Sequence, residues 1–132
     1  MSILEVSSML LEGFRKITLA TGVPSMSITK NGITFNKAAV IKMDKAQSIF
    51  LFLNSSEKKI AIQKCDPEAD GAVPFYKETS GYIAAKINNG DFIHTVSKMM
   101  DWQLDRAGYK CLGDAYPEEG VMIFDLSSAV EI

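Results

Sequence analysis

The sequence predicts a small, strand-rich α+β domain, a barrel or sheet built from two similar strand–helix–hairpin halves. Three observations lead to this prediction: short runs of alternating apolar and polar residues, an asparagine before each of two amphipathic segments, and turn residues between the runs. The chain has 132 residues, of which 47% are hydrophobic and 23% are charged. These values suit a single domain over residues 1–132 and exclude a disordered chain.

The first half of the chain, residues 1–64, carries the clearest local signals. The dipeptide Asn31-Gly32 tolerates positive φ at both central positions of a tight turn, and Asn36 is a good helix N-cap. Phe50 and Phe52 alternate on what we expect to be a core face. The expected elements are strands at 25–29 and 33–35, a helix at 37–43, and a hairpin of strands at 48–53 and 60–64.

The second half, residues 75–132, repeats this outline. An acidic, Pro- and Gly-containing stretch at 66–74 is the best candidate for a linker within the domain. Residues 1–20 fit a helix or a strand equally well, because Gly13 interrupts their helical spacing. The elements expected after the linker are a short strand at 75–77, a strand at 82–87, a helix at 92–104, and strands at 108–113 and 120–126 around a loop at 114–119.

Charge is divided unevenly between the two parts of the chain. Residues 1–64 contain nine basic and four acidic residues, a balance of +5, whereas residues 65–132 contain five basic and twelve acidic residues, a balance of −7. A basic half beside an acidic half indicates an anionic partner or a self-complementary dimer. The simpler alternative is that the solvent-exposed surfaces of the two parts differ in charge by chance.

Several classes of function lack their sequence signals. No apolar run approaches the roughly 18 to 20 residues that cross a bilayer, and the N-terminus lacks the basic residue of a secretory signal. Phosphate-binding loops of the GxxxxGK[ST] and GxGxxG types are absent from the sequence. Cys65 and Cys111 are far apart, which favours reduced, structural cysteines over a metal site. We therefore expect a cytoplasmic protein without a cofactor, a metal or a membrane partner.

Asp91 and His94 are the strongest candidates for catalysis, because an i, i+3 pair meets on one helix face. No serine or cysteine in a recognisable nucleophile motif accompanies them. Asp91 is explained equally by the preference for negative charge in the first turn of a helix, and Asp101 and Asp105 by a solvated face. We expect no catalytic residues, and a small-molecule enzyme stays as a third alternative.

Basic residues of the first half are the remaining functional candidates. Lysines at turn tips and helix ends are exposed, and cations gathered on one face bind phosphate without reading sequence. Lysines that only keep the surface soluble are the alternative. The candidate contacts are Arg15, Lys16, Lys30, Lys37, Lys42, Lys45, Lys58 and Lys59.

Residues 27–64, from "SITKNGITFNKAAVIKM" to "SIFLFLNSSEKKIAIQK", resemble the swapped-hairpin barrel of the AbrB and MazE family of DNA-binding regulators and antitoxins. "NGITFN" keeps the glycine and alternating apolar residues of that family's "G-x-[IV]-x-[IV]-P" motif, with Asn36 in place of the proline. The resemblance implies an interleaved homodimer with basic residues on DNA, and it makes Lys30 and Lys37 the best-placed contacts. Arginine is absent from this segment, which disfavours readout of a specific DNA sequence.

These observations predict a DNA-binding transcriptional regulator that contacts the phosphate backbone through its basic first half and is a homodimer. The alternative is a non-catalytic interaction or scaffold module that self-associates through its complementary charged halves.

Overall fold

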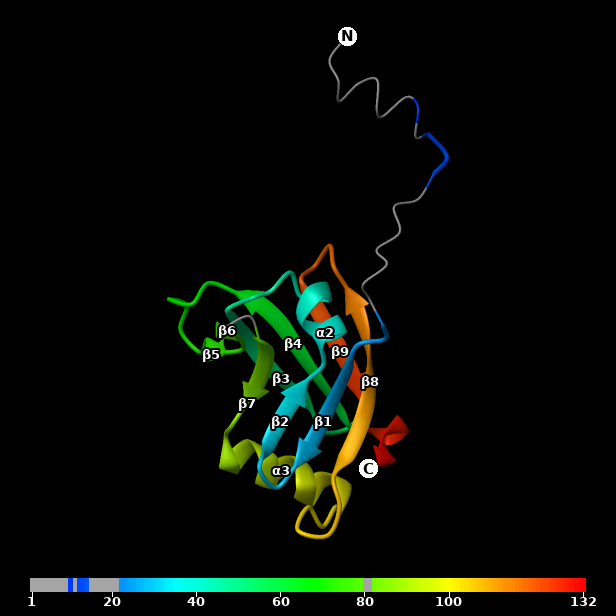
Figure 1. The fold of residues 1–132 in the computed structure, drawn as a ribbon. Coiled ribbons are helices and arrows are strands. Elements are labelled where there is room, and N and C mark those ends of the chain that lie inside the picture. The colour runs from blue at the N-terminus through cyan, green and yellow to red at the C-terminus, as the bar shows by residue number, and fades with distance from the viewer. Residues whose placement is uncertain (1–9, 11, 15–21, 80–81) are drawn as a thin grey trace.

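One antiparallel sheet, wrapped into a nearly closed barrel, dominates the computed structural model of this protein (Figure 1). The structure describes residues 10, 12–14, 22–79 and 82–132. The strands lie in the order β5-β3-β4-β9-β8-β1-β2-β7-β6, and β10 pairs with β8. The strand-rich α+β prediction is therefore confirmed, and the interpretation of residues 1–20, with Arg15 and Lys16, lies almost wholly outside the described residues.

The elements of the first half follow the predicted order. Asn36 caps α2 as expected, because its Oδ1 accepts a hydrogen bond of 2.9 Å from the Ala39 backbone amide. The same oxygen accepts a hydrogen bond from the Ser25 amide at 3.0 Å, so the cap also fixes the start of β1. The elements are β1 (Ser25–Thr29), β2 (Gly32–Phe35), α2 (Lys37–Lys42), β3 (Ser48–Asn54) and β4 (Lys59–Cys65).

The β1–β2 turn differs from the prediction in its position. Thr29 pairs with Gly32, so the turn is centred on Lys30 and Asn31 rather than on Asn31 and Gly32. Gly32 has a φ of 144°, and Asn31 does not have a positive φ. Because glycine lacks a Cβ, Gly32 can adopt a conformation directly after the turn that other residues avoid. The turn therefore lies one residue earlier than predicted.

The second half contains β5 (Val73–Pro74), β6 (Tyr76–Thr79), β7 (Tyr82–Ile87), α3 (Gly90–Met100), β8 (Tyr109–Tyr116), β9 (Val121–Asp125), a 3₁₀ turn (Leu126–Ser128) and β10 (Val130–Glu131). Asn89 caps α3 by accepting from the Phe92 amide at 3.0 Å. The predicted linker forms a turn-rich loop into the short strand β5.

Two predicted boundaries in the second half are wrong. The helix expected over 92–104 ends at Met100, because Asp101 is left-handed with a φ of 56° and the Trp102 ring then stacks on Tyr109 at 4.2 Å. The loop expected over 114–119 is shorter, since β8 continues to Tyr116. Alternation along β8 places the Asp114 side chain on the solvent side. The charge of Asp114 therefore does not end the strand.

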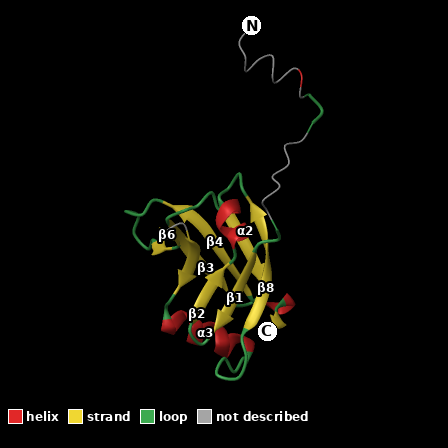
Figure 2. Ribbon diagram, in the orientation of Figure 1, coloured by secondary structure: helices red, strands yellow, loops and turns green. Residues whose placement is uncertain are grey.

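The core fills the barrel between its two ends. Figure 2 shows α2 at one end of the sheet and α3 at the other. Phe124, Ile60, Ile62 and Met122 are fully buried, and the Phe35 and Phe75 rings pack edge to face with centroids 4.9 Å apart. No helix in the described residues is long and apolar enough to span a membrane.

The two cysteines are free thiols in different surroundings. Cys65 is half-buried, whereas Cys111 is buried and its thiol donates a hydrogen bond of 2.9 Å to the Asp125 carbonyl. Burial is the main cause that raises the pKa of the Cys111 thiol, which keeps it protonated near neutral pH. This environment agrees with the predicted reduced, structural role of Cys111.

Candidate nucleic-acid interface

Four neighbouring strands carry a row of polar and basic side chains on the outside of the barrel. Lys86 of β7 pairs with Thr34 of β2, Thr34 pairs with Ser27 of β1, and Ser27 pairs with Lys110 of β8. Their chain neighbours are buried, among them Ile28, Ile33 and Ile87, so alternation directs the row to solvent. A lysine therefore lies at each end of a row of two hydroxyl residues, and the row contains no carboxylate.

Further residues extend this row into a surface. Thr29 lies next to the row on β1, Lys30 occupies the β1–β2 turn, and Lys77 is exposed on β6. We define the basic face as these residues together with the row: Ser27, Thr29, Lys30, Thr34, Lys77, Lys86 and Lys110.

The dimensions of the basic face suit an extended anion. Adjacent strands lie about 4.8 Å apart, so the backbones of β7 and β8 are separated by about 14 Å across the row. Lys86 fills the space above Gly32, since a Cβ at Gly32 would lie only 2.7 Å from Cε of Lys86. The Lys86 side chain therefore extends across the sheet instead of away from it.

A hollow of about 270 Å³ borders the basic face beside β6 and β7. Lys77 and Lys86 both line it, together with Pro74, Phe75 and Asn88. The residues that line this hollow thus include two lysines and one amide side chain. Phosphate oxygens accept hydrogen bonds from these groups, so the hollow is suited to a phosphate at the edge of the face.

The lysines of the basic face are not neutralised by the ion pairs seen in the described part of the chain. One of those pairs joins Lys64 to Asp44 at 3.0 Å, and the other joins Lys59 to Glu57 at 3.9 Å. Both lie outside the basic face. The hydroxyls of Ser27 and Thr34 also make no hydrogen bond to another described residue, which leaves them available to a bound anion.

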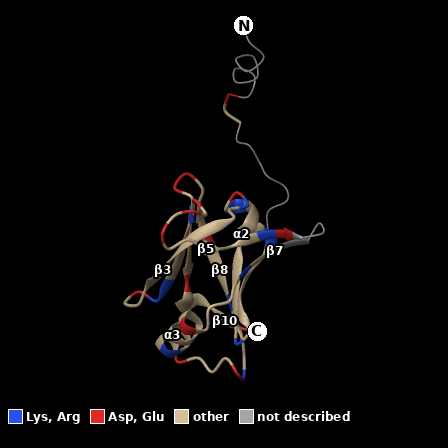
Figure 3. Ribbon diagram, turned by 90° about the vertical axis from the view of Figure 1, so that its left-hand side faces the viewer, with Lys and Arg blue, Asp and Glu red and all other residues tan. Residues whose placement is uncertain are grey.

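The basic residues predicted from the sequence lie in separate places. Lys37 and Lys42 belong to α2 and Lys45 follows it, whereas Lys58 and Lys59 lie at the β3–β4 turn near the α3 end. Figure 3 shows Lys and Arg positions both at α2 and near α3. Of the predicted contacts that the structure describes, only Lys30 belongs to the basic face.

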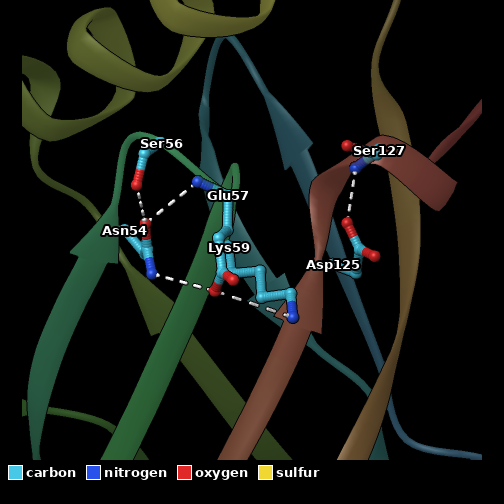
Figure 4. Close-up of polar contacts among 6 residues, drawn as sticks. All are labelled: Asn54, Ser56, Glu57, Lys59, Asp125 and Ser127. Carbon is cyan, nitrogen blue, oxygen red and sulfur yellow. Dashed lines mark hydrogen bonds and ion pairs between the residues drawn. The ribbon is translucent and has the colours of Figure 1, made fainter.

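The polar side chains of the β3–β4 turn mostly contact other residues of the same turn (Figure 4). The Asn54 Oδ1 accepts hydrogen bonds of 3.0 Å from both the Glu57 amide and the Ser56 hydroxyl. The Glu57 carboxylate accepts from the Asn54 side-chain amide at 3.1 Å and lies 3.9 Å from the Lys59 ammonium. Lys59 is therefore partly neutralised, and the turn is ordered by its own contacts.

The expectation that Phe50 and Phe52 lie on the core face is wrong. Ile49, Leu51 and Leu53 point inward, and Phe52 is 49% exposed on the outer face of β3. Every residue from Ile49 to Leu53 is apolar, so alternation cannot tell which set is buried.

The residues considered for catalysis lie on the surface. His94 and Asp91 are both exposed on α3, whereas the catalytic alternative requires His94 in a cleft. Asp91 lies in the first turn of α3, and Asp101 forms the left-handed C-cap. In the described residues, no group of three or more His, Cys, Asp or Glu side chains is arranged to hold a metal ion.

Comparisons with known proteins do not assign this chain to a family. No protein-family model matches the sequence, and neither a curated protein nor a solved structure matches it. The basic face is therefore the feature of the described residues that bears most directly on function.

Proposed function

We propose that this protein binds DNA by its phosphate backbone through the basic face. The observation that carries this proposal is the row Lys86–Thr34–Ser27–Lys110, in which lysines flank hydroxyl side chains and no acidic residue intervenes. Lysine and hydroxyl donors are common partners of phosphate oxygens. The missing side chain at Gly32 lets Lys86 lie over β2, close to this row.

The chemistry of the basic face favours binding that does not depend on base sequence. Specific readout in the major groove typically uses arginine or amide side chains, and single-strand binding uses aromatic rings for stacking. The basic face contains neither. Lysine contacts to phosphate contribute affinity through counterion release at any sequence.

The AbrB and MazE resemblance supports a regulatory role for this binding. It assigns DNA contact to Lys30 and Lys37, and Lys30 lies in the basic face at the β1–β2 turn. A chain that binds DNA with little sequence preference would regulate transcription by covering or organising DNA rather than by selecting one operator. Lys37 belongs to α2 and lies outside the basic face.

A duplication of the β-β-α-β-β unit is a further part of the proposal. The unit β1-β2-α2-β3-β4 and the unit β6-β7-α3-β8-β9 have the same order, and an asparagine caps each helix. Corresponding strands of the two units also pair with each other, β2 with β7 and β4 with β9. The two units would then be degenerate copies that complete one barrel within a single chain.

The salt dependence of DNA binding tests the proposed function. We expect a labelled duplex to bind at low ionic strength with log K falling against log[salt] at a slope of about −3.6, if each of the four lysines of the basic face contacts one phosphate. Fluorescence anisotropy over a salt series measures this slope, and two duplexes of unrelated sequence should give similar affinities. Absence of binding to any duplex at low salt would refute the proposal.

A further inference from the structure

One edge of the barrel lacks a partner strand along most of its length. In the described residues, β4 pairs with all seven residues of β3, whereas β5 pairs only with Ser48 and Ile49 on the other side. The Gln47 carbonyl accepts a hydrogen bond of 2.9 Å from the Phe75 amide on the β5 side. Because backbone groups alternate along a strand, those of Leu51 and Leu53 point to this same side. Beyond Ile49, no described strand pairs with these backbone groups.

The sequence of β3 does not protect this edge. Natural sheets discourage pairing at an open edge with charged residues or proline. The opposite edge strand, β6, follows this rule because it carries Lys77 and Glu78. The strand β3 reads Ser-Ile-Phe-Leu-Phe-Leu-Asn and contains neither a charge nor a proline. The contrast between the two edges indicates that a partner covers the β3 edge.

Apolar side chains lie on the outer face directly beside this edge. The Phe50 and Phe52 rings pack edge to face with centroids 6.5 Å apart, and Phe52 is 49% exposed. Across the sheet, Phe52 is followed by Ala61 of β4 and Ile123 of β9, which line a hollow of about 230 Å³ with it. An open edge and an exposed aromatic surface therefore coincide.

We infer that a second copy of this chain covers the β3 edge. The two β3 strands pair antiparallel about a two-fold axis through the backbone groups of Leu51 and Leu53, with Phe52 of one copy beside Phe52 of its partner. Aromatic pairs across neighbouring strands stabilise such a sheet. The result is a continuous sheet through both barrels.

The charges around the edge favour a copy of the same chain over a partner of one charge sign. Lys59 lies opposite Asp125 across β4 and β9 and 3.9 Å from Glu57, and Lys58 is exposed in the turn. A two-fold interface places a surface against itself, so its rim needs both signs to be complementary. The basic face lies on other strands, β6-β7-β2-β1-β8 (Figure 1). Pairing through β3 therefore leaves it free in both copies. The inference does not depend on the proposed function.

Sedimentation velocity of the full chain and two variants tests this interface. We expect the wild type to sediment as a dimer and Phe52→Lys to sediment with half that mass, because the substitution puts a charge at the centre of the edge. The matched control Val130→Lys, at a residue of β10 that is 62% exposed, should remain a dimer. A wild type that is monomeric at about 100 µM, a concentration far above a micromolar Kd, overturns the inference, as does a dimeric Phe52→Lys.

Hydrogen exchange in the wild type decides the same question if Phe52→Lys fails to fold. In a β3-paired dimer, the Leu51 and Leu53 amides are hydrogen-bonded between copies, so their exchange should be at least about tenfold slower at high than at low protein concentration. Amides of β4, which pair within one chain, should not change in this way. Fast, concentration-independent exchange at Leu51 and Leu53 contradicts the interface.

Discussion

Replacing Lys86 and Lys110 together by glutamate is expected to lower the affinity for duplex DNA about 100-fold, or about 1.4 kcal/mol for each lysine. These residues flank the row on the basic face, and the substitutions place carboxylates where phosphates would bind. The slope of log K against log[salt] should also become shallower by about 2 units. Both side chains are exposed, so the free energy of unfolding should change little.

The control for this experiment is the double variant Lys58→Glu with Lys98→Glu. It changes the net charge by the same amount, but Lys58 lies in the β3–β4 turn and Lys98 lies on α3, both outside the basic face. We expect this variant to retain affinity within a few-fold of the wild type. Equal losses for the two double variants would show that net charge, and not the basic face, determines binding.

Truncation of Phe124 to alanine is expected to lower the free energy of unfolding by about 3 to 5 kcal/mol. Phe124 is fully buried on β9, its ring centroid lies 5.8 Å from that of Phe35, and a Cβ at Gly113 would lie 2.6 Å from its ring. The ring therefore fills the space between three strands, and its removal leaves a cavity that the neighbouring atoms fill only in part. Such a loss is a large part of the 5 to 15 kcal/mol or so that stabilises a typical domain.

Urea unfolding measures this loss, with Tyr116→Ala as the matched control. Tyr116 is an aromatic residue of the same β8–β9 hairpin, but it is 46% exposed, so its truncation should cost less than about 1 kcal/mol. Similar costs for the two variants would contradict the described core.

Local signals in the sequence were sufficient for much of the fold. Asn36 and Asn89 each cap a helix because a side-chain oxygen next to an amphipathic segment satisfies a free backbone amide, and this depends on neighbouring residues alone. The hairpins were predicted for the same reason. Where local signals were ambiguous, the prediction failed: β3 is apolar on both faces, so Phe50 and Phe52 were assigned to the core.

The basic face was not predictable from the sequence, because it depends on pairing between distant segments. Lys86 meets Thr34 only through the β2–β7 register, and Lys110 meets Ser27 only through the β1–β8 register. Periodicity shows which side of a strand a residue occupies, but not which strand lies beside it. The balance of charge predicts a binding surface in the first 64 residues, whereas three of the four lysines of the basic face lie in the acidic second half.

Mapping the bound surface by NMR tests whether DNA contacts the basic face. A short duplex is added to isotope-labelled protein at low salt, and the backbone amide shifts are followed residue by residue. We expect the largest shift changes at Ser27, Thr34, Lys86 and Lys110, with small changes over α2 and over the β3–β4 turn. Changes concentrated at α2 or at the β3–β4 turn, or the absence of changes on the β7-β2-β1-β8 face, would contradict it.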